Sequence, residues 1–498
     1  MQGRTAMGLK SLIAGPYARF VTRAVMRRAL EPVATQERVL KDLVAKGAST
    51  EFGREHELAQ VRGHADLVDA VPLRDYEGLK PWIDRLVAGE RDVLWPGAPL
   101  YLCKTSGTTS GAKYIPITRD SLPNHIDGAR RALLAHIART GRAEFVDGKM
   151  IFLQGSPVLD TSGAVPTGRL SGIVANHVPA YLLKNRLPGL ATNSIPDWET
   201  KVDAIVEETI GQDLRLISGI PAWVQMYFER LLARTGKANV LEVFPRFSLF
   251  VYGGVNYGPY RPRMEALIGA SVPSVELFPA SEGFIAYQDQ GPGEGLLPVL
   301  DKGIYFGFLP MHAADRKPLS IGEVEVGKHY ALVLYTNAGL WGYELGDVVR
   351  FVSLSPPRML VTGRTRHFTS AFGEHVIAEE VEGALQEAVG AVPCEVAEFT
   401  VAPQLTPEDG GLARHEWHIE FASEPDDKAA FAKILDEALQ RRNPYYRDLI
   451  TGNVLRPLEL VPVRRGGFAA WMKARGMNDA QSKVPRLAND RRYVDGLG

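Results

Sequence analysis

Cysteine is scarce in this chain. Among 498 residues there are only Cys103 and Cys394, which lie far apart in the sequence. This excludes a disulfide-stapled scaffold and favours a reducing compartment, so we expect a cytoplasmic protein. Cys103 directly precedes a Ser/Thr/Gly-rich stretch, where it is compatible with a nucleophile or with a small buried residue at a strand end.

Long apolar runs and a strong net charge are also lacking. No apolar run approaches the length of a membrane span, and Lys10 interrupts the short apolar segment near the N-terminus, which argues against a secretory signal. The formal net charge is −1, so no global field attracts nucleic acid or an anionic membrane. We therefore expect neither of these as a partner, although local basic patches remain compatible with the composition.

The chain is long enough for two or more domains. Its first part predicts helices from about Phe20 to Lys46, with Pro32 breaking or starting one of them. Short apolar runs then alternate with helical patterns, which favours an α/β fold with a mostly parallel sheet. The expected strands are Met150–Leu153, Leu214–Ile217, Phe247–Tyr252 and Val275–Phe278, and the expected helices between them are Trp198–Ile210 and Ala222–Ala233.

The pattern changes in the last third of the chain. Short strands and glycine-rich turns from Leu296 to Val361 predict an antiparallel, barrel-like subdomain, and a turn at Gly363 suggests a boundary. Beyond it we expect a smaller α/β unit, so the predicted domains are 1–362 and 363–498. Its expected elements are a helix at Ala378–Val389, strands at Glu395–Val401 and Glu416–Phe421, and a helix at Asp427–Arg442.

Hydroxyl side chains and glycines fill every position from Thr105 to Gly111. Consecutive backbone N–H groups in such a loop can form a concave anion site, to which the hydroxyls add donors. The same composition is also typical of a solvated linker, but an apolar-alternating segment, Tyr114 to Thr118, follows directly and predicts a strand. The stretch lacks the Gly-Lys-Ser/Thr ending of a Walker loop, so it is not a P-loop of that kind.

Two carboxylates follow small or apolar residues in positions that suit ligand contact. Glu282 comes just after an apolar strand, where it could bind Mg²⁺ together with phosphates, or serve as a salt-bridge or helix N-terminal residue. Asp347 follows Gly346, where it could accept ribose hydroxyls or be an ordinary turn residue. Phe278 is compatible with stacking on a base and with a place in the core. The segment His415–His418 lacks a third metal ligand at a suitable spacing, and the charged run Arg486–Arg492 is interpreted as a solvated face.

The order of these motifs resembles that of the adenylate-forming superfamily, and within it the Gretchen Hagen 3 family of acyl acid amido synthetases, of which we expect a bacterial member. The similar segments are Thr105–Gly111 with Tyr114–Pro116, Phe278–Glu282, Tyr343–Asp347 and Gln481–Arg486. One position departs from the family pattern: the third motif usually carries arginine after tyrosine, and here Glu344 follows Tyr343.

The resemblance implies a large N-terminal adenylation domain and a smaller, mobile C-terminal domain. It also implies roles for individual residues. Those expected to bind the nucleotide are Ser106, Gly107, Thr108, Thr109, Ser110, Gly253, Gly254, Phe278, Ser281, Asp347 and Arg364. Lys113 is a weaker phosphate candidate. Glu282 would hold Mg²⁺, and Lys483 would act at the reacting oxygens. Trp223 and Tyr227, with the Leu122–Ala132 helix, would line the acyl pocket.

The expected activity is ATP- and Mg²⁺-dependent adenylation of a small carboxylic acid, followed by acyl transfer to an amine, which we expect to be that of an amino acid. Two alternatives stay open. An acyl-coenzyme A ligase would share the first step, and a non-catalytic nucleotide-binding protein would share only the fold.

Overall fold

The computed structural model describes residues 8–108, 111–177, 184–195, 198–254, 257–311, 316–364, 376–404, 407, 412–451, 455–475, 477, 484–488 and 491–497. The chain divides into two compact units, each described by itself below. The first contains residues 1–345 and 350–360, and the second contains 346–349 and 361–498. None of the described helices is both long and apolar enough to cross a bilayer.

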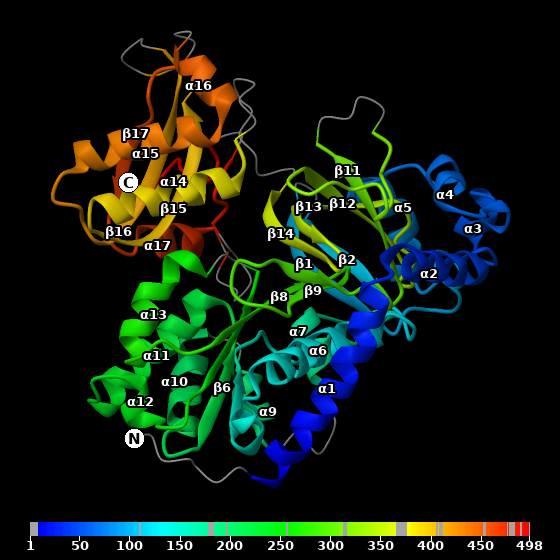
Figure 1. Cartoon of the computed structure of the whole chain (residues 1–498), viewed down its shortest axis with the longest axis horizontal. Helices are drawn as coiled ribbons and strands as arrows, with labels where there is room; N and C mark the ends of the chain where they lie inside the picture. Colours follow the sequence, from blue (N-terminus) through cyan, green and yellow to red (C-terminus); the bar gives the residue numbers. More distant parts are fainter. Residues whose placement is uncertain are drawn as a thin grey trace. The chain divides into compact units, whose positions relative to one another are not determined.

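The first unit is built on a long mixed sheet, seen in Figure 1. The order of its strands is β11-β12-β13-β14-β10-β9-β8-β7-β6-β3-β5, of which β13 and β14 also carry residues of the second unit. The strands are β3 (Lys149–Phe152), β5 (Arg186–Leu187), β6 (Leu214–Ser218), β7 (Leu249–Gly253), β8 (Ser274–Ala280), β9 (Gly283–Gln288), β10 (Leu296–Pro298), β11 (Ile304–Pro310), β12 (His329–Thr336), β13 (Tyr343–Leu354) and β14 (Pro357–Arg364).

Strands β5, β3, β6, β7 and β8 are parallel, as the four apolar runs predict. The pairs β8–β9, β9–β10, β10–β14 and β11–β12 are antiparallel. The glycine-rich region after Leu296 is thus antiparallel as expected, but it continues the same sheet and is not a separate barrel. The two parts form one sheet because β9 pairs with β8 on one side and with β10 on the other.

Helices cover both faces of the parallel part. The described helices of the first unit are α1 (Leu9–Ala29), α2 (Pro32–Gly47), α3 (Glu51–Glu55), α4 (His64–Ala70), α5 (Tyr76–Val87), α6 (Leu122–Thr140), α7 (Leu170–Ala175), α9 (Leu190–Asn193), α10 (Trp198–Thr209), α11 (Pro221–Thr235), α12 (Val240–Val243) and α13 (Arg261–Ile268). Pro32 and Pro221 occupy the starts of α2 and α11, where their missing N–H groups leave no hydrogen bond unmade. The expected helix near Phe20 begins earlier, at Leu9.

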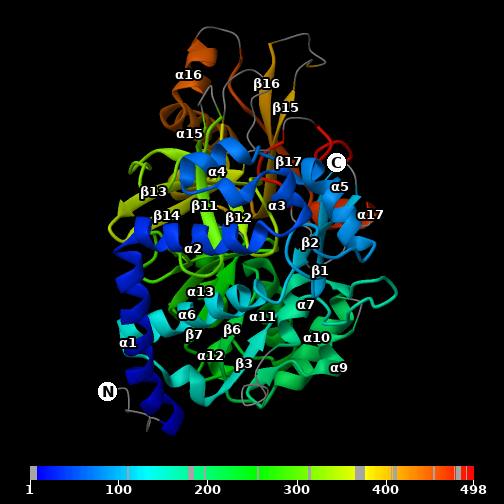
Figure 2. The same ribbon diagram turned by 90° about the vertical axis from the view of Figure 1, so that its right-hand side faces the viewer.

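Two apolar clusters hold these layers together. One joins α10, α11 and α13 to one face of β3, β6 and β7, and the other joins α1 and α6 to the opposite face. The second view shows α1 running along the outer edge of the unit (Figure 2). A separate sheet, of order β2-β1-β4, consists of β1 (Tyr101–Thr108), β2 (Gly111–Ile117) and β4 (Thr167–Gly168).

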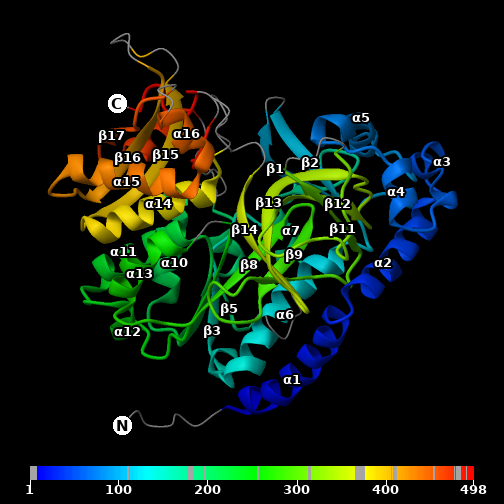
Figure 3. The same ribbon diagram turned by 45° about the horizontal axis from the view of Figure 1, so that its top comes forward.

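The second unit is a small α/β sandwich (Figure 3). Its sheet has the order β15-β16-β17. The strands are β15 (Glu395–Gln404), β16 (Arg414–Ser423) and β17 (Glu459–Val463), and the helices are α14 (Ala378–Ala391), α15 (Lys428–Arg442), α16 (Pro444–Thr451) and α17 (Gly467–Ala474). Alternation along β15 sends Val401 towards α14 and α15, and Ala402 towards α17. Asp427 caps α15 by accepting a hydrogen bond from the N–H of Ala430.

Candidate active site

The Ser/Thr/Gly stretch lies at the tip of the β1–β2 hairpin. Strand β1 continues to Thr108, so more of the stretch is strand than the loop prediction assumed. Pairing explains this, because Thr105 lies opposite Lys113 and Thr108 opposite Gly111, with a register shift between them. The structure describes the backbone of Ser106, Gly107 and Thr108 without their side chains, while Thr109 and Ser110 lie outside the described residues.

Cys103 connects this hairpin to the end of β8. Its side chain is 1% exposed, and its Sγ donates a hydrogen bond to the Oγ of Ser281 over 3.3 Å. Burial raises the pKa of the Cys103 thiol to about 11, although the hydrogen bond to Ser281 acts in the opposite direction. The thiol is therefore protonated at neutral pH. Of the two interpretations of Cys103, the structure supports the buried residue at a strand and not the nucleophile.

Glu282 lies in the turn between β8 and β9, as expected for a residue just past an apolar strand. Its Oε1 accepts a hydrogen bond from the hydroxyl of Tyr343, at the start of β13, over 3.1 Å. The second and third motifs, which are 61 residues apart at these positions, therefore meet directly. Sequence reasoning quoted Tyr343 in its motif but gave it no role, because the contact depends on a long-range pairing of strands.

Asn124 holds the backbone just after this turn. Its side-chain oxygen accepts a hydrogen bond from the N–H of Phe284, and its side-chain nitrogen donates one to the carbonyl of the same residue. Gly128, one helical turn later on α6, leaves room for the Phe284 ring, whose atoms a Cβ would approach to 2.2 Å. The expected acyl-pocket helix Leu122–Ala132 thus has a supporting contact with β9 that sequence patterns did not indicate.

Glu344 and Tyr343 point to opposite faces of β13, because neighbouring strand residues alternate. Each oxygen of the Glu344 carboxylate lies 2.8 Å from the same guanidinium nitrogen of Arg316. The residue that departs from the family pattern, Glu344, therefore forms an ion pair on the face away from Glu282.

The end of β7 needs its two glycines for different reasons. A Cβ on Gly253 would lie 2.6 Å from the carbonyl oxygen of Leu277 on the neighbouring strand. Gly254 has a φ of +79°, which disfavours other residues. Phe278 lies on β8 and is mostly buried, so it remains compatible with both of its interpretations.

Glu276 lies two residues before Phe278 and faces the same side of β8. The hydroxyl of Tyr252 lies 3.4 Å from its Oε2. Burial raises the pKa of Glu276 to about 7, so part of this carboxyl population is protonated at neutral pH.

The two predicted acyl-pocket residues differ. Trp223 is partly exposed near the start of α11, just beyond β6. Tyr227 is fully buried in the core, and its hydroxyl lies 2.7 Å from that of Thr209. Tyr227 is therefore a core residue, and we do not retain it in the acyl pocket. The spacing of four residues predicts that Trp223 and Tyr227 lie on the same face of the helix. One end of that face is at the surface and the other is in the core, so the two residues differ in burial.

In the second unit, Asp347 is buried in β13. Arg364 ends β14, but its side chain is not described. Lys483 lies outside the described residues. The chain just after it is anchored, because the hydroxyl of Thr400 donates to the carbonyl of Pro485, and the N–H of Val401 donates to the carbonyl of Arg486.

The interpretation of Arg486–Arg492 as a solvated face is wrong. Arg486 forms an ion pair with Glu398 and lies over the ring of Phe399, and Arg491 forms an ion pair with Glu416. Leucine at 487 has no exposed surface. The run looked solvated because its partners are on strands β15 and β16, about 75 to 90 residues earlier in the chain.

Among the described residues there is no group of three or more His, Cys, Asp or Glu side chains placed to hold a metal ion. A single carboxylate such as Glu282 is nevertheless suited to Mg²⁺, which keeps water ligands and is commonly shared with substrate phosphates. The carboxylate oxygens of Glu282 are ligands of the kind that this ion prefers.

Known proteins resemble this chain over most of its length. The chain matches the GH3 family N-terminal domain over residues 24–194, the GH3 family central domain over 297–364 and the GH3 family C-terminal domain over 379–492. It is 22% identical to the indole-3-acetic acid-amido synthetase GH3.3 of Arabidopsis thaliana, covering 91% of this chain and 89% of that protein. It is 21% identical to the jasmonoyl–L-amino acid synthetase GH3.5 of Oryza sativa subsp. japonica, covering 91% and 92%.

Two solved structures have the same fold. One is the AtGH3.15 acyl acid amido synthetase in complex with 2,4-DB, with a TM-score of 0.78 at 16% identity, covering 95% of each chain. The other is a 2-hydroxyisobutyryl-CoA ligase, with a TM-score of 0.58 at 14% identity, covering 86% of this chain and 85% of the other. The α/β fold, with its large N-terminal and smaller C-terminal parts, is thereby confirmed. With three successive family models matched along most of its length, the chain belongs to the GH3 family.

Proposed function

We propose that this protein is a ligase that adenylates a small carboxylic acid with ATP and then transfers the acyl group to the amine of an amino acid. The observation that carries the proposal is the meeting of the second and third motifs through Tyr343 and Glu282, in a chain of the GH3 family. The relatives named above are amido synthetases, which supports an amine as the acceptor.

In the first step, a carboxylate oxygen of the acid attacks the α-phosphorus of ATP, and pyrophosphate leaves. In the second, the amine nitrogen attacks the acyl carbon, loses a proton and expels AMP. Both partners of the first step are anions, so the protein must neutralise charge and hold the reacting atoms in line.

We assign the phosphates to the hairpin tip, Ser106–Ser110. Backbone N–H groups and hydroxyls there would donate to phosphate oxygens. Cys103 supports this assignment, because it fixes β1 against Ser281 at the end of β8. Glu282 would hold Mg²⁺, which supplies positive charge to the phosphate oxygens when bound.

We assign the adenine to Gly253, Gly254 and Phe278, and the ribose to Asp347 and Arg364. The close approach that Gly253 permits to Leu277, the neighbour of Phe278 on β8, supports the adenine assignment. Lys483 is assigned to the reacting oxygens because it precedes an anchored segment in the family's motif order. Trp223 is retained for the acyl group.

We further propose that the domain boundary lies between 362 and 363 and that the C-terminal domain is mobile. Val361 begins the main part of the second unit, which supports a boundary close to that position. A cytoplasmic location is proposed on the two free cysteines. The relatives compared above are plant proteins and do not support a bacterial source. That source stays a prediction from the sequence.

An acyl-coenzyme A ligase is the second candidate, favoured by the fold shared with the 2-hydroxyisobutyryl-CoA ligase. The protein should be incubated with ATP, Mg²⁺ and a set of carboxylic acids, with amino acids and coenzyme A competing as acceptors. We expect an amide as the main product by mass spectrometry. A dominant thioester would refute the amido synthetase assignment, and no pyrophosphate with any acid would favour a non-catalytic nucleotide-binding protein.

A further inference from the structure

The outward side of α1 is both apolar and basic. We call these residues the α1 surface: Leu9, Leu12, Ile13, Phe20, Leu30, Arg19, Arg23 and Arg27. The opposite side of the helix, with Ala18 and Ala29, packs into the cluster shared with α6. One face of α1 therefore packs against the protein, and the opposite face is exposed to solvent along the helix.

The apolar members of this surface are strongly exposed. Leu9 is 75%, Phe20 71% and Ile13 63% exposed. Their spacing of four and seven residues places them on one side of the helix. Between Leu9 and Leu30 the surface extends about 30 Å at the helical rise per residue. Single exposed apolar residues are ordinary, but several on one side of the same helix mark an interaction surface.

The charges on this surface have one sign. No acidic residue occurs before Glu31 in the sequence. Arg28 is paired within the protein, because it shares the carboxylate of Asp301 with Arg131. Within the described part of the chain, Arg19, Arg23 and Arg27 have neither an ion pair nor a side-chain hydrogen bond. Charge complementarity therefore requires an anionic occupant.

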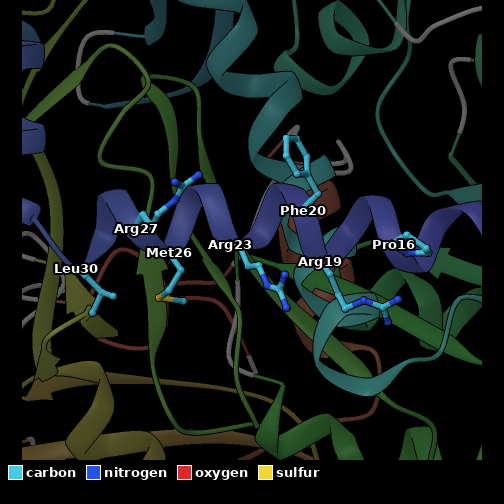
Figure 4. Close-up of a pocket in the computed structure, with 7 residues that line it drawn as sticks. All are labelled: Pro16, Arg19, Phe20, Arg23, Met26, Arg27 and Leu30. Carbon is cyan, nitrogen blue, oxygen red and sulfur yellow. The ribbon is translucent and has the colours of Figure 1, made fainter.

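The shape of the surface argues for an extended occupant. A shallow hollow of about 730 Å³ is lined by Pro16, Arg19, Phe20, Arg23, Met26, Arg27 and Leu30. All of these belong to α1 or directly follow it, as Leu30 does, so no second element forms an opposing wall that would hold a peptide. Figure 4 shows Phe20 and Arg27 on one side of the helix axis and Arg19, Arg23 and Met26 on the other, so apolar and cationic groups alternate along it.

We propose that the α1 surface docks on the face of an anionic phospholipid membrane. The apolar side chains would enter the boundary between headgroups and acyl chains, and the long arginine side chains would extend to lipid phosphates. A second copy of the chain fits less well, because a symmetric pairing of this surface brings cations together with no acid on either helix. The earlier expectation of no membrane partner rested on spans and net charge, and a surface-lying helix needs neither.

This property goes beyond the proposed reaction. The family match begins at residue 24, so Leu9, Ile13, Phe20 and Arg23 precede the part of the chain that the family model covers.

The test is co-sedimentation of the full chain with vesicles of phosphatidylcholine alone or mixed with phosphatidylglycerol. We expect binding only to the mixed vesicles, weakening as salt is added. Arg23→Gln with Arg27→Gln should reduce the partition coefficient roughly fivefold for each arginine. Ile13→Ser with Phe20→Ser should reduce it further, because insertion is lost. Matched controls at exposed sites elsewhere, Arg91→Gln with Arg119→Gln and Leu190→Ser, should bind like wild type.

The proposal is overturned if the mixed vesicles bind no more protein than phosphatidylcholine alone. Wild-type binding by the Ile13→Ser, Phe20→Ser variant would also overturn it, since the apolar stripe would then be idle. Two further measurements test the alternative binding partners, an acidic protein and a second copy of the chain. Binding to polyglutamate but not to vesicles would indicate an acidic protein partner, and a dimer in sedimentation velocity that Phe20→Ser dissociates would indicate a second copy. Either result without vesicle binding contradicts the membrane assignment.

Discussion

The hydroxyl of Tyr343 donates a hydrogen bond to the Glu282 carboxylate over 3.1 Å. This contact joins the turn after β8 to the first residue of β13. A hydrogen bond of this kind fixes the orientation of the side chain that accepts it. The position of the Glu282 carboxyl group is therefore held from β13, which suits the metal-binding role proposed for it.

Tyr343→Phe should lower pyrophosphate exchange about tenfold and raise the Mg²⁺ concentration needed for half-maximal rate, because a hydrogen bond to a charged group contributes roughly 1.5 kcal/mol or more. Exchange measured across a Mg²⁺ titration gives both quantities. Tyr330→Phe is a matched control, since Tyr330 is another buried tyrosine whose hydroxyl binds the N–H of Glu325. Equal effects of the two changes would show that Tyr343 acts only through stability.

Glu282→Gln should keep the fold and lose most of the exchange activity. Glutamine preserves the shape and can still accept the bond from Tyr343, but it removes the negative charge that Mg²⁺ needs. Thermal melting would verify the fold, and pyrophosphate exchange would measure the loss. A variant that exchanges at the wild-type rate would make Glu282 a structural residue.

Glu276→Gln should change how stability depends on pH. The pKa of this carboxyl is about 7 in the folded protein, against an ordinary value of 4.5, because burial disfavours its charge. The folded state therefore keeps the proton to higher pH than the unfolded state, and the free energy of unfolding falls between about pH 4.5 and 7. Glutamine has no such loss. The melting temperature of the variant minus that of wild type should therefore be higher at pH 8 than at pH 5. The exposed Glu395→Gln serves as control, and an equal difference at both pH values would contradict the assignment.

Lys483→Ala should reduce adenylation by roughly a hundredfold, the scale of one lost transition-state contact. A compact ammonium group can neutralise the oxygens at the α-phosphate during attack by the carboxylate. Amide formation from a supplied acyl-adenylate should be affected far less, because that step does not form the bond to phosphorus. Lys473→Ala, an exposed lysine on α17, is the control. Equal losses in both half-reactions would mean that Lys483 only positions its domain.

The parallel strands were predictable because each apolar run is short and ends in small or polar residues. The four expected strands match β3, β6, β7 and β8 within a few residues. Local periodicity carries that information. The first half of α1 was missed for the same reason: its outward face is as apolar as its inward one, so the sequence from Leu9 to Phe20 shows no amphipathic contrast.

Contacts between distant segments were not predictable from one sequence. Asn124 supports Phe284 across 160 positions, and Arg491 binds Glu416 across 75. Nothing in the local pattern distinguishes these side chains from solvated ones. Tyr227 shows the reverse case, because helical spacing correctly paired it with Trp223 but could not show how deep the helix face runs. The roles of Thr109, Ser110 and Lys483 stay predictions.

The register shift in β1 makes the length of the β1–β2 hairpin as informative as its composition. Between Thr105 and Thr108 the pairing with β2 slips, so the in-and-out parity of the strand before the shift differs from that after it. A single deletion there would restore regular parity, so Cys103 and the other side chains before the shift would change face relative to the strand beyond it. Two hairpins of the same composition, differing by one residue, would thus place Cys103 on opposite sides. The count of residues is itself part of what the motif encodes.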